Sequence, residues 1–153
     1  MARIAFLLFA ASVAWPLHAE TTAPERIYAQ GLVNQTVKKY PDLLVVAMHV
    51  TPPNQTENVI IASNIARIGK RADAEDFHVI RTGEMLAKVN KNRDRFEVEL
   101  LLLDASRRPI GALAIVFPYK AGDDPAMFKT RAETIRDELA ARIPQLSKLM
   151  EPF

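Results

Sequence analysis

The sequence predicts an α+β domain in which one five-stranded antiparallel sheet carries helices at its ends or on one face. Three observations support this fold class. Apolar residues at helical spacing precede the first β-type segment and recur after the last one. Five short segments between them have the composition or the alternation of strands. Helices do not alternate regularly with these segments, so a doubly wound parallel sheet is disfavoured.

The first part of the chain has the layout of a secretory signal peptide. Arg3 supplies a positive charge, residues 4–13 are apolar and uncharged, and cleavage is expected after Ala19. The apolar stretch is shorter than the roughly 20 residues that a membrane-spanning helix needs. We therefore expect residues 20–153 to form one exported domain, in the bacterial periplasm or outside the cell. An uncleaved anchor is the alternative, because Leu17 stands where a small residue is preferred.

The composition excludes several classes of protein. With 49% hydrophobic and 25% charged residues, the chain does not have the composition of a disordered protein. It contains no cysteine, which excludes disulfides, thiolate metal ligands and a cysteine nucleophile. Loss of Arg3 with the leader lowers the formal net charge from +2 to +1, and no basic run carries interleaved aromatic residues. We therefore expect no nucleic-acid partner.

The first half of the mature chain predicts a helix followed by two strands. Apolar positions at three- and four-residue steps predict an amphipathic helix over 25–40, which Pro41 ends. Residues 43–50 are nearly all apolar, as in a central strand that is buried on both faces. A polar segment with two prolines separates them from a second strand at 59–63. The basic loop that leaves this strand, residues 64–70, is a candidate rim for a ligand site.

A short helix and three strands follow. Asp73 begins a helix with acidic residues in its first turn, where the helix dipole favours them, and Gly83 ends it. Residues 85–90 predict a weak strand, polar enough to lie at an edge or at a pocket mouth. Residues 95–102 alternate between polar and apolar side chains, which is the clearest β pattern in the chain. A turn then leads into a last strand over 110–119.

The end of the chain predicts a long helix and an apolar tail. Gly111, in the last strand, indicates a close approach of two backbones. The final helix is expected over 126–143, because Pro144 ends it. The tail that follows carries four apolar residues, Leu146, Leu149, Met150 and Phe153. It is expected either to fold back onto the domain or to present an apolar patch.

Five segments of the mature chain carry the pattern of a known family. They are Asn-Val-Ile-Ile-Ala-Ser at 58–63, Arg-Ile-Gly-Lys at 67–70, Arg-Thr-Gly at 81–83, Phe-Glu-Val-Glu-Leu at 96–100 and Arg-Pro-Ile-Gly-Ala-Leu at 108–113. Together they resemble the single Cache domains, PAS-like (PDC) sensors of small molecules outside bacterial cells. The resemblance implies a long N-terminal helix, a PAS-like five-stranded antiparallel sheet, a short cap helix and a C-terminal helix. It also implies a ligand pocket between the sheet and a cap formed by residues 64–82.

Three features depart from the family pattern. The aromatic-rich amino-acid-binding motif of double-Cache receptors is missing, and the only tryptophan is Trp15, in the expected leader. Citrate- and dicarboxylate-type sensors often carry a His-Pro pair ahead of the Arg-Ile-Gly stretch, where this chain has Ser63 and Asn64. No apolar segment that could span a membrane follows the last helix. A free-standing binding protein is therefore expected, or one that signals through a separate membrane-bound protein.

The loop after the second strand holds the first candidate ligand-binding residues. Arg67 and Lys70 lie three residues apart, and in the family this loop and the next helix cap the pocket. The resemblance implies that such cations hold an anionic ligand through charge-assisted hydrogen bonds. Asn64 belongs to the same loop. The alternative is that the two cations are solvated charges.

Two histidines are further candidates for ligand contact. His49 lies in an apolar strand and would point into the pocket if it shares a face with Val45 and Ala47. His78, inside the short helix, would line the pocket from the other side. A hydrogen-bonded structural histidine and a solvated helix residue are the alternatives. No metal-binding motif joins the two histidines, so we expect no metal.

Polar residues of the later strands complete the set. Lys88 lies on the weak strand, and Arg95, Glu97 and Glu99 share one face of the alternating strand. If that face looks into the pocket, these residues form its polar floor. If it looks outward, they are solvated or paired across strands, which is the more usual outcome for such a face.

Two hypotheses about function follow from the sequence. The first is an exported sensor-type domain that binds a small polar or anionic molecule, with no cofactor. Catalysis is not expected, because Ser63 and Ser106 lie in no nucleophile motif and no phosphate-binding glycine loop exists. The second is a protein–protein interaction or homodimerisation module of the same fold, suggested by the apolar tail.

Overall fold

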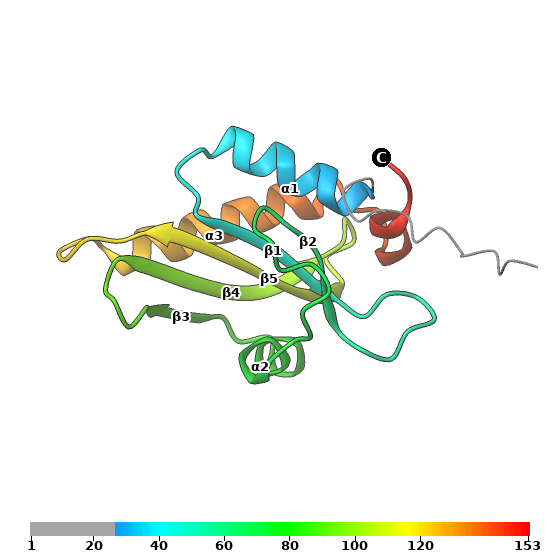
Figure 1. Ribbon diagram of the computed structural model, residues 1–153, viewed down its shortest axis with the longest axis horizontal. Coiled ribbons are helices and arrows are strands. Elements are labelled where there is room, and N and C mark those ends of the chain that lie inside the picture. The colour runs from blue at the N-terminus through cyan, green and yellow to red at the C-terminus, as the bar shows by residue number, and fades with distance from the viewer. Residues whose placement is uncertain (1–26) are drawn as a thin grey trace, which may run out of the picture.

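The computed structural model describes residues 27–153, so the expected leader and its cleavage point lie outside the described residues. In chain order the elements are α1 (Tyr28–Lys39), β1 (Val45–Val50), β2 (Val59–Ser63), α2 (Ala74–Thr82), β3 (Leu86–Val89), β4 (Arg95–Leu103), β5 (Pro109–Pro118), α3 (Pro125–Ala140) and the 3₁₀ helix η2 (Leu146–Met150) (Figure 1). This is the predicted order of helices and strands. The bounds differ from the predicted ones by a few residues, mainly at helix ends.

The five strands form one antiparallel sheet in the order β2-β1-β5-β4-β3. The predicted α+β fold with a five-stranded antiparallel sheet is thus confirmed. Figure 1 shows α1 and α3 together on one face of the sheet and α2 on the opposite face. Helices therefore occupy both faces, whereas the sequence indicated helices at the ends or on one face only.

The strand β4 shows how the two faces of the sheet differ. Phe96, Val98 and Leu100 are buried, and the ring of Phe96 stacks on Phe128 of α3 with 5.0 Å between ring centroids. Successive side chains of a strand point to opposite faces. Glu97 and its polar neighbours on this strand therefore face α2 and not the helical core.

The strand β1 is buried on both faces, as its apolar sequence predicted. Its partner β5 approaches it closely at Gly111. A Cβ on Gly111 would lie 2.0 Å from the carbonyl oxygen of His49, a distance that no side chain can occupy. Only glycine allows this pairing, so the predicted close approach of backbones is confirmed.

The helix α2 begins and ends at the predicted residues. The Asp73 carboxylate accepts the N–H groups of Glu75 and Asp76, and the Asp76 carboxylate accepts the Asp73 N–H at 2.8 Å. Gly83 ends the helix with φ of 75°, a left-handed conformation that favours glycine. This capping box holds Asp76 on the face of α2 that is turned to the sheet, where it is only 2% exposed.

The C-terminal tail packs against α1. Leu149 is fully buried, and the Tyr28 N–H donates to the Glu151 carbonyl oxygen at 2.7 Å. Phe153 lies over Gly31, where a Cβ would come within 2.6 Å of its ring, although the ring itself is 68% exposed. The tail thus folds back onto the domain and leaves little of the apolar patch on which the interaction hypothesis rests. Within residues 27–153, none of the helices has the length and apolar character of a membrane span.

Candidate functional site

A cavity of about 460 Å³ lies between the sheet and the cap, residues 64–82. Strands β1, β4 and β5 form its floor, and the loop between β2 and α2, the first turn of α2 and one residue of β3 form its sides. This is where the family resemblance implied a ligand pocket. The volume lies within the range typical of small-molecule sites.

The register of the strands determines the floor of the cavity. Ala47 of β1, Ala114 of β5 and Glu99 of β4 are direct cross-strand neighbours. The next row holds Val45, Val116 and Glu97. The side chains of Ala47 and Ala114 are small, so they leave space beside Glu99 that a close-packed protein interior would fill with larger side chains.

His49 and Asp76 form a buried pair in the wall of the cavity. His49 Nδ1 lies 3.1 Å from Asp76 Oδ2, and the two side chains are 6% and 2% exposed. The contact lacks the geometry of a hydrogen bond, and His49 Nδ1 and Asp76 Oδ1 have no hydrogen-bond partner in the described part of the chain. Burial acts to raise the pKa of Asp76, but His49, the Asp73 N–H and Lys70 together lower that pKa below its usual value. Asp76 is therefore an anion at neutral pH.

Glu99 is the second carboxylate that is largely withdrawn from solvent in this cavity. Burial raises the pKa of Glu99 to about 7, and the negative charges of Asp76, Glu75 and Asp73 add to this effect. Its Oε2 atom has no hydrogen-bond partner within residues 27–153. Lys88 is the cation that opposes the shift, but its ammonium group donates to the Glu75 carboxylate instead. Glu99 thus lines the cavity with one carboxylate oxygen that lacks a hydrogen-bond partner within the described residues.

Two cations of the β2–α2 loop lie at the rim. Arg67 and Lys70 are exposed and line the cavity. The loop follows the edge of β2, because the Ile60 N–H donates to the Lys70 carbonyl oxygen at 2.9 Å and the Gly69 N–H donates to the Ile60 carbonyl oxygen at 2.8 Å. Gly69 has φ of 86°, which favours glycine there. Lys70 Nζ also lies 3.5 Å from Asp73, so the loop is joined to the start of α2.

Two further cations approach the cavity from β3 and β4. Lys88 of β3 lies opposite Glu97 in the register and forms an ion pair with Glu75 of α2. Arg95, at the start of β4, is exposed and lines the same cavity. The lining as a whole carries five carboxylates and four Arg or Lys cations, apart from His49. The lining is therefore a surface of mixed charge, with the basic loop at its rim.

The structure brings five of the seven predicted residues to this cavity. They are His49, Arg67, Lys70, Lys88 and Arg95. Their contact with a ligand stays a prediction. The face of β4 that carries Arg95, Glu97 and Glu99 looks into the cavity, so the outward orientation that is more usual for such a face does not hold here.

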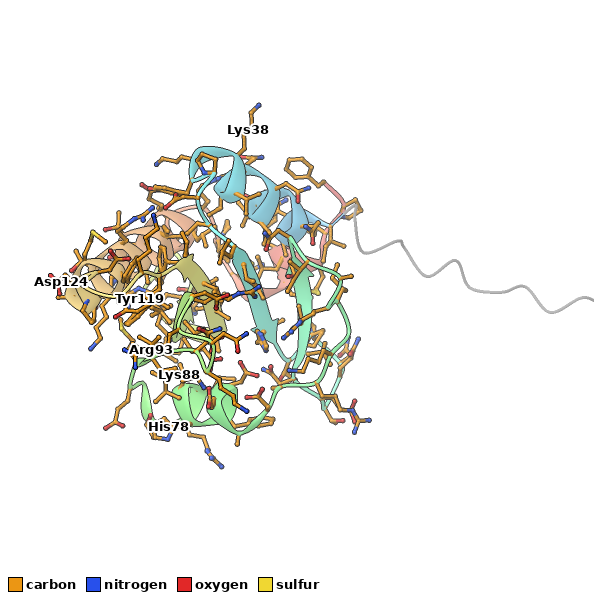
Figure 2. All side chains as sticks on the ribbon, turned by 60° about the vertical axis from the view of Figure 1, so that its left-hand side comes forward. Lys38, His78, Lys88, Arg93, Tyr119 and Asp124 are labelled. Carbon is orange, nitrogen blue, oxygen red and sulfur yellow. The ribbon has the colours of Figure 1, made fainter. Side chains whose placement is uncertain are left out.

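Two predicted residues, Asn64 and His78, lie outside the cavity. The Asn64 amide group accepts the Val46 N–H at 2.8 Å and donates to the Leu44 carbonyl oxygen at 3.1 Å, so it holds the start of β1. His78 Nε2 lies 3.2 Å from a Glu84 carboxylate oxygen. Figure 2 shows His78 at the outer edge of α2, because it lies about 200° around the helix from Asp76.

The sequence analysis missed the contribution of α2 to the site. It assigned the acidic residues of the first turn to the helix dipole, whereas Asp73, Glu75 and Asp76 all line the cavity. One signal was present in the sequence. Asp76 lies three residues before Val79, and residues at this spacing share a helix face. These are the two buried residues of α2.

The sequence matches no family model and no curated protein. The fold, by contrast, is similar to several solved structures. One is a protein from Burkholderia vietnamiensis described as a GAF sensor, with a TM-score of 0.55 and 14% identity over 78% of this chain and 77% of that chain. Another is the inducer-binding domain of the PobR transcription factor from Acinetobacter, in a double mutant complexed with 3-hydroxybenzoic acid, with a TM-score of 0.50 and 12% identity over 77% of this chain and 96% of that chain.

Two further structures have the same fold. The repressor BlcR from Agobacterium tumefaciens has a TM-score of 0.52 and 14% identity over 76% of this chain and 67% of that chain. A type II free methionine-R-sulfoxide reductase from Thermoplasma acidophilum has a TM-score of 0.53 and 13% identity over 79% of this chain and 91% of that chain. At these identities the comparisons establish the GAF/PAS-like fold alone. They do not confirm membership of the Cache family.

Proposed function

We propose that this domain is a sensor-type module that captures a small polar or anionic molecule between the sheet and the cap. The observation that carries the proposal is a pair of buried carboxylate oxygens in the cavity wall, Asp76 Oδ1 and Glu99 Oε2, which have no hydrogen-bond partner within residues 27–153. A buried polar group without a hydrogen bond costs about 1–3 kcal/mol. A ligand that supplies the missing partners would recover part of that cost.

The cap is suited to respond to such a ligand. The ion pair between Lys88 and Glu75 joins β3 to α2, and the contact of Lys70 with Asp73 joins the loop to α2. These side chains are about half exposed, and exposed ion pairs contribute only about 0–1 kcal/mol each. A ligand that contacts both the sheet and the cap would therefore shift an existing equilibrium between cap positions.

The folds of the similar structures support binding more than catalysis. Three of the four are described as a sensor, an inducer-binding domain and a repressor, and one is a reductase. In the PobR domain the fold is described in complex with 3-hydroxybenzoic acid, a small aromatic acid. The chain described here contains no cysteine, so reactions that need a protein thiol are not open to it.

We further propose an exported, free-standing domain of the single Cache type. The signal-peptide layout of residues 1–19 supports export to the bacterial periplasm or exterior, and the five family-like segments support the Cache assignment. A membrane-bound signalling protein is then the proposed receiver of a change in the cap. N-terminal sequencing of the protein recovered from the periplasm of an expressing bacterium tests cleavage after Ala19.

A thermal-shift screen of the purified protein against organic acids, amino acids and nucleobases tests the binding function. We expect compounds of at least one class to raise the Tm in a dose-dependent way. Arg67→Ala should weaken the binding of an anionic hit about tenfold, because it removes a charge-assisted hydrogen bond at the rim. The matched control is Arg81→Ala, an exposed arginine of α2 that does not line the cavity. A flat response of both variants and of the wild type to every compound contradicts the proposal.

A further inference from the structure

Charge is not spread evenly over the cavity: two of its carboxylates, Asp76 and Glu99, lie deep, whereas Asp73 and Glu75 are about half exposed and lie with the cations at the opening. Asp76 is 2% exposed, and the Oε2 atom of Glu99 is inaccessible to solvent. Arg67, Lys70 and Arg95 are all exposed. A bound molecule would therefore meet carboxylates at its inner end and cations at its outer end.

We infer that the ligand carries a protonated amino group, which Glu99 and Asp76 hold at the deep end of the cavity, and an anionic group, which Arg67 and Lys70 hold at the rim. A small amino-carboxylate, such as an amino acid, has this chemistry. The inference rests on the proposed function, because it concerns the ligand of the same cavity. It narrows the proposed polar or anionic ligand to a zwitterion.

The hydrogen-bonding capacity of the deep end favours an ammonium group. An ionised carboxylate only accepts hydrogen bonds, and both Glu99 Oε2 and Asp76 Oδ1 lack a donor within residues 27–153. An ammonium group brings three donors and a positive charge. A carboxylate placed there would meet two acidic side chains and would be repelled, and a hydroxyl group would bring one donor and no charge.

Within residues 27–153, no lysine or arginine forms an ion pair with Glu99 or Asp76. Lys88 is the cation whose charge acts on Glu99, but its ammonium group donates hydrogen bonds to the Glu75 carboxylate of α2. The groups in the described part of the chain do not form a cluster of three or more that could hold a metal ion. An organic cation therefore fits the two carboxylates better than a metal ion does.

The charge state of Glu99 gives the inference a pH dependence. The other titratable and charged groups of the cavity are His49 on β1; Arg67, Lys70 and Asp73 in the loop; Glu75 and Asp76 on α2; Lys88 on β3; and Arg95 and Glu97 on β4, whereas β5 contributes only Ala114 and Val116. Burial raises the pKa of Glu99 to about 7, while the pKa of Asp76 stays below its usual value. Below pH 7 a proton therefore competes with the amino group for Glu99. Between pH 8 and pH 6 this competition weakens binding about tenfold.

Matched compounds and variants test the inference. The probes are the common α-amino acids and, for each, the amine that lacks the carboxylate and the acid that lacks the amino group. Affinities are measured by isothermal titration calorimetry at pH 8 and pH 6. We expect the best amino acid to bind at least tenfold more tightly than its matched acid, and Glu99→Gln to abolish that difference. Glu133→Gln, an exposed position on α3, is the matched control and should leave every affinity unchanged.

The rim is tested in the same series. Arg67→Ala should weaken the binding of the amino acid but not the binding of the matched amine, because the amine has no anionic group that the rim could hold. The pH dependence of the wild type is an independent measurement that needs no variant. It should be absent in Glu99→Gln.

The outcomes separate this inference from the proposed function. If acids without an amino group bind as tightly as the amino acids, and Glu99→Gln leaves their affinity unchanged, the inference is wrong while the binding function stands. If no compound in this panel or in the wider thermal-shift screen binds, both are wrong. An affinity that is equal at pH 8 and pH 6 also contradicts the inference.

Discussion

The two faces of the sheet are built by the same strands, yet one face is filled and the other encloses a cavity. On the first face, Phe96 and Leu100 of β4 pack into the core under α1 and α3. On the second face, Glu97 and Glu99 of the same strand line a cavity of about 460 Å³. The covering helices differ as well, since α3 has 16 residues and α2 has 9.

This difference separates the part of the molecule that stabilises the fold from the part that is free to bind. On the helical face, removing apolar side chains from water is favourable and scales with the buried area. On the cavity face, removing Glu99 from water is unfavourable, and this raises its pKa. Substitutions at neighbouring residues of β4 should therefore change the free energy of unfolding in opposite directions.

The largest effect is expected on the helical face, where Leu100 is 2% exposed. Leu100→Ala should lower the free energy of unfolding by about 2–5 kcal/mol, because it leaves a void in a packed core. Urea unfolding followed by circular dichroism measures this change. The comparison variant is Leu101→Ala, whose half-buried side chain lies on the other face of β4 and should cost less. Equal losses for both variants would remove the distinction between the faces.

A smaller loss is expected for the buried acid of α2. Asp76→Asn should lower the free energy of unfolding by about 2 kcal/mol at pH 7, because hydrogen bonds to a charged group are stronger than those to a neutral one. The folded state lowers the pKa of Asp76, so its stabilising effect is present above the unfolded pKa near 3.8 and is lost as the pH falls through the lower folded value. The difference between the variant and the wild type should thus disappear in strong acid. Urea unfolding from pH 7 to pH 2 measures it, and a constant difference over that range contradicts the assignment.

The smallest effect has the opposite sign. Glu99→Gln should raise the free energy of unfolding by about 1–2 kcal/mol at pH 8. This is less than the full free-energy equivalent of the pKa shift, because the carboxylate is partly solvated. The folded state raises the pKa of Glu99 from 4.5 to about 7, so the wild type is penalised once the pH exceeds 4.5 and bears the full penalty above pH 7. At pH 4 the two proteins should be equally stable. Thermal unfolding at both pH values measures the difference, and a destabilised variant at pH 8 would show that Glu99 has a structural partner.

Much of the fold could be predicted from the sequence because it depends on short-range patterns. The alternation of β4, the Pro41 boundary after α1 and the acidic start of α2 each rest on residues that are close in the chain. Gly111 was recognised by its place in a strand pattern, and the structure adds the atom that it must avoid, the His49 carbonyl oxygen. These features follow from backbone geometry and periodicity, which a sequence shows directly.

The candidate site could be predicted only in part. The resemblance placed a pocket between the sheet and residues 64–82, and Arg67, Lys70 and His49 do line the cavity there. Asn64 and His78 lie outside the cavity, because the Asn64 side chain bonds to the start of β1 and His78 contacts Glu84 on the outer side of α2. The direction in which a loop or helix side chain points depends on packing that no local pattern encodes.

By itself, the sequence determined the order of the elements, the antiparallel α+β sheet and the two opposite faces of β4. Only the tertiary structure decided that the polar face of β4 looks into a cavity, that Ala47 and Ala114 leave that cavity open, and that Asp76 closes one wall. The reason is physical. A pKa near 7 for Glu99 arises from burial and from the charges of a helix elsewhere in the chain, and these come together only when the sheet and α2 have packed.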